Sequence, residues 1–211
     1  MGKREDLTIP VELAWAVACA AYRINDGYFK AGFAADDQKA NTELIYEILQ
    51  DQSLLTPQDH KQGVAVRDYI GKTATMATLR GTLDTWGQEM ARVSQLETVT
   101  DRFSFHIIAS MPQTYAHYLQ REKAHTRLSE TADHTQLAVK DKIEITAEVI
   151  EIKFSVKWQC HYITVIDTEN RSWFFAHRRS LPRGSRHVFR GTVKRVDDRM
   201  VQLNRVKILE Q

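Results

Sequence analysis

Apolar residues recur at helical spacing through most of the first 128 positions of the chain. Residues 11–22 are apolar around nearly the whole circumference of a helix, and Pro10 suits its first turn. We therefore expect this first helix to be buried among other helices or at a subunit contact. The same spacing predicts four more helices, over residues 41–50, from residue 57 towards residue 70, over 75–96 and, after a break at residues 110–112, over 113–128.

After residue 140 the apolar positions alternate instead. They are odd-numbered from Ile143 to Val149 and even-numbered from Ile150 to Phe154, so one residue has been inserted. Such an insertion is typical of a β-bulge in a long, bent strand. Further strands are predicted over residues 158–166, 172–177, 187–196 and 200–209, with a turn or a single helical turn over 178–186.

These two patterns predict an α+β protein. It has an all-α helical domain at residues 1–128, a linker at 129–140 and a five-stranded β-barrel at 141–211. A bulged first strand and an interruption between the third and fourth strands are features of the small Greek-key barrel called the oligonucleotide-binding (OB) fold. We therefore expect the barrel to be OB-fold-like.

The 211 residues carry a formal net charge of only +2, but the charges are unevenly distributed. Residues 141–211 contain 14 Lys or Arg and nine Asp or Glu, whereas the first 140 residues have an acidic excess. Residues 171–195 hold eight of these cations, no acid, and an aromatic cluster at Trp173, Phe174 and Phe175. Cations pair with phosphates and rings stack on bases, so this composition favours a nucleic-acid partner. A basic surface can equally serve solubility or an acidic protein partner.

The sequence contains no recognisable motif for catalysis or metal binding. Cys19 and Cys160 stand in no zinc-ligand spacing, and no GxSxG, HExxH or paired acidic motif occurs. Gly71-Lys72-Thr73 resembles the end of a phosphate-binding loop, but Val66 stands where that motif needs glycine. We therefore expect no enzymatic activity, no metal and no cofactor. The start of the chain lacks the apolar core of a signal peptide, which predicts a soluble, intracellular protein.

The third predicted strand has aromatic residues at three successive positions, so its two faces are assigned by parity. We assign Phe174 and Ala176 to the barrel interior. Trp173, Phe175 and His177 are then predicted to lie on the outer face. The alternative for either ring is that it fills the core, because small barrels need large residues there.

The neighbouring strands complete the predicted site. Ile163 and Val165 of the second strand are assigned to the interior, which leaves that strand's aromatic residues outside. Phe189 and Val193 of the fourth strand also point inwards, so we expect Arg190 and Lys194 to flank the same groove or its edge. The predicted nucleic-acid-binding residues are Lys153, Lys157, Trp158, Tyr162, Trp173, Phe175, His177, Arg178, Arg179, Arg183, Arg190 and Lys194.

Several segments resemble uncharacterised proteins of tailed bacteriophages. In the C-terminal part they are KIEITAEVIEIKF, HYITVIDTEN, WFFAHR and GTVKRV followed by LNRVKI. In the N-terminal part they are IPVELAWAVACAAYRINDGY and residues 109–112, Ala-Ser-Met-Pro. The resemblance implies a phage origin, a helical N-terminal domain before an OB-fold barrel and, by analogy of fold alone, nucleic-acid binding. This chain departs from the pattern at residues 154–157, Phe-Ser-Val-Lys, where such barrels usually have glycine and aspartate.

The function we predict is binding of single-stranded DNA, from which RNA is not distinguished, in phage replication, recombination or strand protection in the host cytoplasm. The helical domain is then expected to form a homo-oligomer or to recruit a phage or host replication protein, without a membrane. The alternative is an interaction module that docks on, or inhibits, a host or phage protein through the barrel or the helical domain.

Overall fold

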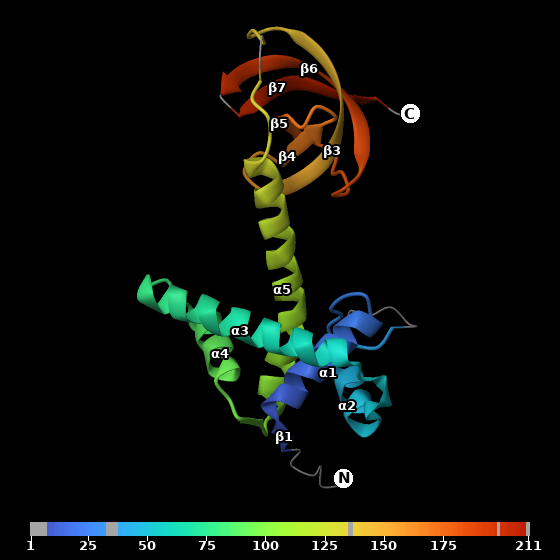
Figure 1. The fold of residues 1–211 in the computed structure, drawn as a ribbon, viewed down its shortest axis with the longest axis vertical. Helices are drawn as coiled ribbons and strands as arrows, with labels where there is room; N and C mark the ends of the chain where they lie inside the picture. The colour runs from blue at the N-terminus through green and yellow to red at the C-terminus, as the bar shows by residue number, and fades with distance from the viewer. Residues whose placement is uncertain (1–7, 33–37, 135–136, 198, 210–211) are drawn as a thin grey trace. The chain divides into compact units, whose positions relative to one another are not determined.

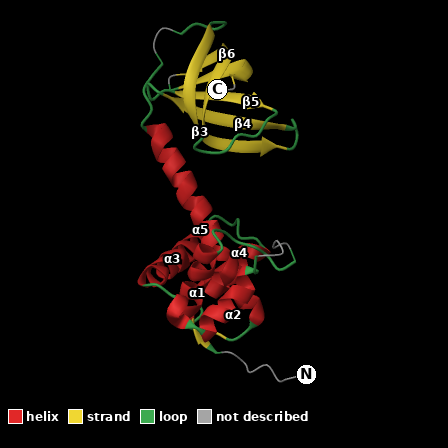
Figure 2. Ribbon diagram, turned by 90° about the vertical axis from the view of Figure 1, so that its right-hand side faces the viewer, coloured by secondary structure: helices red, strands yellow, loops and turns green. Residues whose placement is uncertain are grey.

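The structure is a computed structural model that describes residues 8–32, 38–134, 137–197 and 199–209. The chain forms two compact units, Met1–Leu119 and Gln120–Gln211 (Figure 1). Helices dominate the first unit, and the second contains a β-barrel (Figure 2). The described residues contain five α-helices and a closed five-stranded barrel, so the predicted mixture of helix and sheet is confirmed.

The elements before the barrel are mostly helical. They are β1 (Ile9–Pro10), α1 (Val11–Ile24), α2 (Asn41–Gln50), the 3-10 helix η1 (Gln52–Leu54), α3 (Pro57–Leu79), α4 (Thr85–Ser94), β2 (Thr98–Val99) and α5 (Arg102–Ser129). The two short strands β1 and β2 form an antiparallel pair. Helix α5 begins in the first unit and ends in the second.

Helix α1 lies in the core of the first unit. Its residues 14–21 are each at most 1% exposed, and all of them except Ala16 share one hydrophobic core with side chains of the other four α-helices. Helix α3 approaches α1 at Gly63, where a Cβ atom would stand 2.9 Å from the backbone nitrogen of Ala16. A larger residue would therefore push the two helices apart. The prediction of a buried first helix is confirmed, and the helices that bury it belong to the same chain.

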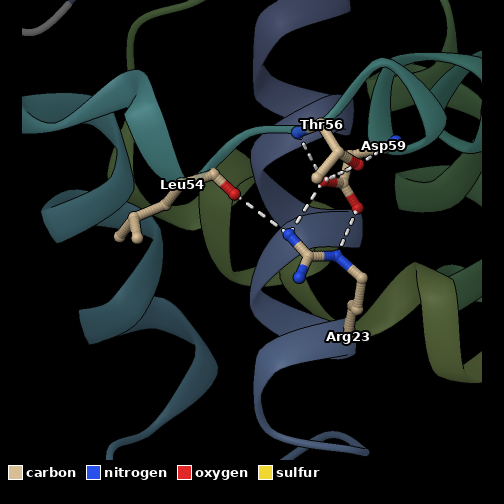
Figure 3. Close-up of polar contacts among 4 residues, drawn as sticks. All are labelled: Arg23, Leu54, Thr56 and Asp59. Atoms are coloured by element: carbon tan, nitrogen blue, oxygen red, sulfur yellow. Dashed lines mark hydrogen bonds and ion pairs between the residues drawn. The ribbon is translucent and has the colours of Figure 1, made fainter.

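An ion pair joins the end of α1 to the start of α3 (Figure 3). The guanidinium of Arg23 donates two 3.0 Å hydrogen bonds to the carboxylate of Asp59 and a third to the carbonyl oxygen of Leu54. The same carboxylate accepts a hydrogen bond from the backbone N–H of Thr56, within a capping box. Burial raises the pKa of Asp59, but the hydrogen bonds from Arg23 and Thr56 outweigh burial and hold that pKa below its ordinary value.

Two helix boundaries differ from the predictions. Residues 75–96 are divided between α3 and α4, because Gly81 turns the backbone with a φ of 66°. Asp84 then caps α4 by accepting a 2.7 Å hydrogen bond from the N–H of Gly87. Helix α5 runs continuously through the break predicted at residues 110–112. Pro112 removes one backbone hydrogen bond, but Pro112 and Met111 are buried in the core, and this packing holds the helix together.

The barrel consists of β3 (Lys142–Ser155), β4 (Cys160–Asp167), β5 (Ser172–His177), β6 (Arg186–Asp197) and β7 (Met200–Leu209). The strands close in the order β3-β4-β5-β7-β6, and every neighbouring pair is antiparallel except the parallel pair of β5 and β7. A register shift between Val149 and Glu151 confirms the predicted bulge in the first strand. Up to Glu148 the strand pairs with β6, and from Ala147 onwards it pairs with β4. The interior positions assigned to Ile163, Val165, Phe189 and Val193 are confirmed.

Candidate nucleic-acid interface

Strand β5 presents the opposite faces from those assigned by parity. Trp173 and Phe175 point into the barrel and are 1% and 0% exposed. The indole Nε1 of Trp173 donates a 2.9 Å hydrogen bond to the carboxylate of Asp167, and the ring centroid of Phe175 lies 5.1 Å from that of Phe189. The prediction that Trp173 and Phe175 lie on the outer face is therefore wrong. Both rings fill the core, so neither can stack on a base.

The outer face of β4 and β5 carries a different pair of rings. Phe174 and Ala176, assigned above to the interior, face outwards, with Phe174 half-buried and Ala176 exposed. The outward orientation predicted for Tyr162 is confirmed, since it alternates with buried Ile163 and pairs with Ala176. The ring centroids of Tyr162 and Phe174 lie 5.7 Å apart, and neither ring belongs to the hydrophobic core of the barrel. We call Tyr162 and Phe174 the outer ring pair.

Residues 154–159, which are the end of β3 and the turn that leads to β4, form an exposed hairpin tip. Phe154, Val156 and Trp158 are 53%, 75% and 64% exposed. The Nζ of Lys157 stands 5.1 Å from the centroid of the Trp158 ring, within the range of a cation–π contact. The exposure predicted for Trp158 is confirmed, but the residue stands in the turn before β4 and not in the predicted strand. The tip therefore combines apolar surface with positive charge.

His177 does not lie on the outer face with Tyr162. It shares the side of β5 that carries Phe175 and pairs with His161 at the end of the barrel, so its predicted position is wrong. The backbone N–H of Arg179 donates a 3.0 Å hydrogen bond to Nδ1 of His177, and Nδ1 of His161 lies 3.2 Å from the carbonyl oxygen of Arg178. The two histidines thus anchor the chain that follows β5.

Ion pairs within the unit engage several of the cations. The pairs are Lys153–Glu151, Arg171–Asp167, Arg171–Glu169, Arg186–Glu148, Arg190–Glu144 and Arg195–Asp197, with N···O distances from 2.6 to 3.9 Å. Arg190 stands in register with Glu144, where β6 pairs with β3. It therefore stands where β6 meets β3, and not on the two strands that carry the outer ring pair.

Other cations are exposed and lack such partners. Among the described residues, no carboxylate pairs with Arg178, Arg183 or Lys194. Arg178 follows β5 directly and contacts His161 through its carbonyl oxygen, which places it beside the β4 strand. Lys194 stands at a register shift of β6. Lys153, although it is paired with Glu151, is opposite Tyr162 on β3 and so borders the outer ring pair.

Sequence reasoning missed Phe154, Phe174 and Arg195. Phe154 continues the apolar phase of β3, and its position just before the turn was the signal that it lies beyond the core. A buried indole needs a polar partner, and Asp167 supplies one to Trp173. Burial of Trp173 places the neighbouring Phe174 on the outer face, which was the signal for Phe174. Arg195 of β6 and Phe174 of β5 both pair with Gln202 of β7, a relation that only the strand pairing reveals.

A pocket of about 300 Å³ lies elsewhere on the second unit. Its lining includes Arg127, Thr146, Glu148, Asp167, Asn170 and Arg186. Arg127 donates hydrogen bonds of 2.8 and 3.2 Å to the carboxylate of Glu148, and these bonds hold the pKa of Glu148 below its ordinary value. The ion pair of Arg127 with Glu148 therefore ties the end of α5 to β3 beside this pocket.

The helices of the described residues are each too short or too polar to span a bilayer. The same part of the chain brings no three His, Cys, Asp or Glu side chains together as ligands for a metal ion. Comparison with protein-family models, curated proteins and solved structures finds no match to this chain. The function of the interface is therefore inferred from its geometry and chemistry.

Proposed function

We propose that the second unit is an OB-fold barrel that binds single-stranded nucleic acid, DNA foremost. The closed strand order supports this assignment, since the OB fold is a five-stranded Greek-key barrel that binds oligonucleotides on its second and third strands. Those strands are β4 and β5 in this chain. A fold alone specifies no ligand, so the proposal depends on what these strands present.

The observation that carries the proposal is the outer ring pair. Tyr162 and Phe174 stand on adjacent strands, with an interplanar angle of 31°, on the side away from the core. Their half-buried positions restrict the rings before any ligand arrives, which lowers the entropic cost of binding. Stacking of a base on such a ring contributes ~1 to 3 kcal/mol and is tolerant of sequence. The expected ligand is therefore a flexible strand with unstacked bases.

The cations around these rings suit a phosphate backbone but are few. Lys153 borders Tyr162, Lys157 stands at the hairpin tip and Arg178 follows β5. With about three phosphate contacts, log K is expected to fall against log salt with a slope of about −2. Affinity is then reduced about 16-fold between 50 and 200 mM salt, so stacking supplies much of the binding.

A fluorescent oligonucleotide titrated with the full chain at low and high salt tests the proposal. We expect saturable binding with the shallow salt slope above. Tyr162→Ala is expected to weaken binding by about fivefold or more, whereas Tyr162→Phe, which keeps the ring, retains it. Absence of saturable binding at micromolar protein contradicts the proposal. Matched DNA and RNA strands of one sequence decide which nucleic acid is preferred.

We further propose that the protein acts in a bacteriophage, during replication, recombination or protection of exposed strands in the host cytoplasm. This rests on the resemblance of the segments quoted above. The helical unit then either recruits a replication protein or mediates self-association. Pull-down of replication proteins from infected cells, together with the sedimentation velocity of the purified chain, separates these two roles.

One observation favours a second candidate function. The hairpin tip exposes Phe154, Val156 and Trp158 together, and exposed apolar clusters are also typical of protein-docking surfaces. An interaction module that binds a host or phage protein through the barrel is therefore the alternative. It predicts that the isolated protein does not bind oligonucleotides.

A further inference from the structure

We propose that the hairpin tip packs on the terminal base pair of a duplex, so that the preferred ligand is a junction between double-stranded and single-stranded nucleic acid. The inference rests on the proposed function and specifies its ligand. The outer ring pair takes the bases of the single strand. The tip takes the flat end of the adjoining duplex.

The tip is available because the fold makes little use of its side chains. The last β4–β5 pair is His161 with His177, so among the described residues the turn beyond it has no paired strand on the β5 side. On the other side, β3 pairs with β6 only up to Glu148. Val156 and Trp158 are 75% and 64% exposed, and neither belongs to the core of the barrel. Their apolar surface is therefore free to contact a ligand.

The chemistry of the tip matches the end of a duplex. Residues 153–166 contain two lysines and no acidic residue. The indole of Trp158 and the side chain of Val156 together offer more apolar surface than one unstacked base needs. A terminal base pair presents two adjoining bases and therefore matches that surface better. Apolar side chains that insert at base steps are a known mode of nucleic-acid contact, and Lys157 beside the indole suits the phosphates of either strand.

The separation along the chain between Trp158, in the β3–β4 turn, and Tyr162 of β4 limits the length of single strand that the two sites require. Tyr162 lies four positions after Trp158, which at about 3.3 Å per residue is a distance of at most ~13 Å. Stacked nucleotides of one strand repeat at about 3.4 Å, so about four nucleotides bridge this distance. An overhang of about four nucleotides is therefore long enough to reach the outer ring pair while the duplex end contacts the tip.

Anisotropy titrations with the full chain test this inference. The labelled probes are an oligo-dT strand, a blunt duplex and the same duplex with dT overhangs of about two, four and eight nucleotides. We expect overhangs of about four or more to bind at least about fivefold more tightly than the oligo-dT strand or the blunt duplex. Trp158→Ala is expected to lower the ratio of junction to single-strand affinity towards one.

Trp86→Ala is the matched control, because Trp86 is also an exposed tryptophan, 48% exposed, and lies in the helical unit. It is expected to leave the ratio unchanged. A 2-aminopurine in the terminal base pair provides a second readout, since contact with the indole changes its fluorescence in the wild type and not in Trp158→Ala.

The outcomes are distinguishable. Equal affinity for single strand and junction, or a ratio that Trp158→Ala leaves intact, overturns this inference while the proposed function stands. Failure of all oligonucleotides to bind overturns both and favours a protein partner for the tip.

Discussion

Phe174 and Phe175 are adjacent in β5 but lie on opposite faces of the barrel wall, so truncation of each ring has a different consequence. Phe175 is 0% exposed, pairs with Ile163 and packs against Phe189. Its replacement by alanine leaves a cavity in a small core and is expected to cost ~3 to 5 kcal/mol of unfolding free energy. Phe174 is only half-buried and outside that core, so Phe174→Ala is expected to cost ~1 kcal/mol.

Urea unfolding of the full chain measures this difference. With a slope of about 2 kcal/mol per molar urea, Phe175→Ala lowers the midpoint of the barrel transition by about 2 M and Phe174→Ala by about 0.5 M. Tryptophan fluorescence follows the transition because Trp173 lies inside the barrel. Oligonucleotide affinity gives the opposite ranking. Phe174→Ala loses about fivefold or more, through the lost stacking surface.

Phe103→Ala is the control for both measurements, since Phe103 is 56% exposed and lies in the helical unit. It is expected to change neither the barrel midpoint nor the affinity. The reverse result, in which Phe174→Ala unfolds the barrel and Phe175→Ala keeps the midpoint but loses affinity, would refute the face assignment and the proposed interface together.

Three further predictions concern other parts of the chain. Gly63→Ala is expected to destabilise the helical unit by ~1 to 3 kcal/mol in urea, because the added Cβ meets the α1 backbone at 2.9 Å. The added Cβ of Gly71→Ala lies 3.6 Å from its nearest neighbour, so this variant is expected to stabilise the unit by up to ~1 kcal/mol, and equal effects would contradict the close approach. Asp59 has a folded-state pKa below its ordinary value, so its contribution to the unfolding free energy is present above about pH 4 and is lost as the pH falls through the folded-state pKa. Asp59→Asn is expected to lose less stability than the wild type over that pH interval. Burial, followed by the charge of Asp59, raises the pKa of Cys19 to about 12. We therefore expect an alkylating reagent to label only Cys160 in the native protein and both thiols in denaturant, and labelling of Cys19 in the native protein would contradict its burial.

The elements of the fold follow largely from local sequence signals. Helical spacing identified the buried first helix and α2, and the change of apolar phase after Val149 identified the bulge of β3. These patterns are readable because each depends on residues close together in the chain. Pro112 shows the limit of local reading. Proline favours a break, yet burial of its neighbours in the core maintains α5 through it.

The interface was less predictable because its geometry depends on distant residues. Trp173, Phe174 and Phe175 are all apolar, so alternation cannot choose the buried face of β5. The choice follows from the hydrogen bond of Trp173 to Asp167, which no local pattern reveals. Arg190 pairs with Glu144, 46 positions earlier, and this partner is identified only by the register of β3 and β6.

Closure of the barrel by β7 has a consequence for synthesis in the cell. This strand pairs with β5 on one side and β6 on the other, so a nascent chain has two open sheet edges until residues 200–209 leave the ribosome. Open edges are templates for intermolecular strand pairing, and such long-range pairing forms slowly. A premature stop codon before β7 therefore yields an aggregation-prone polypeptide and not a weakened binder. The last ten residues of the barrel control its solubility as well as its shape.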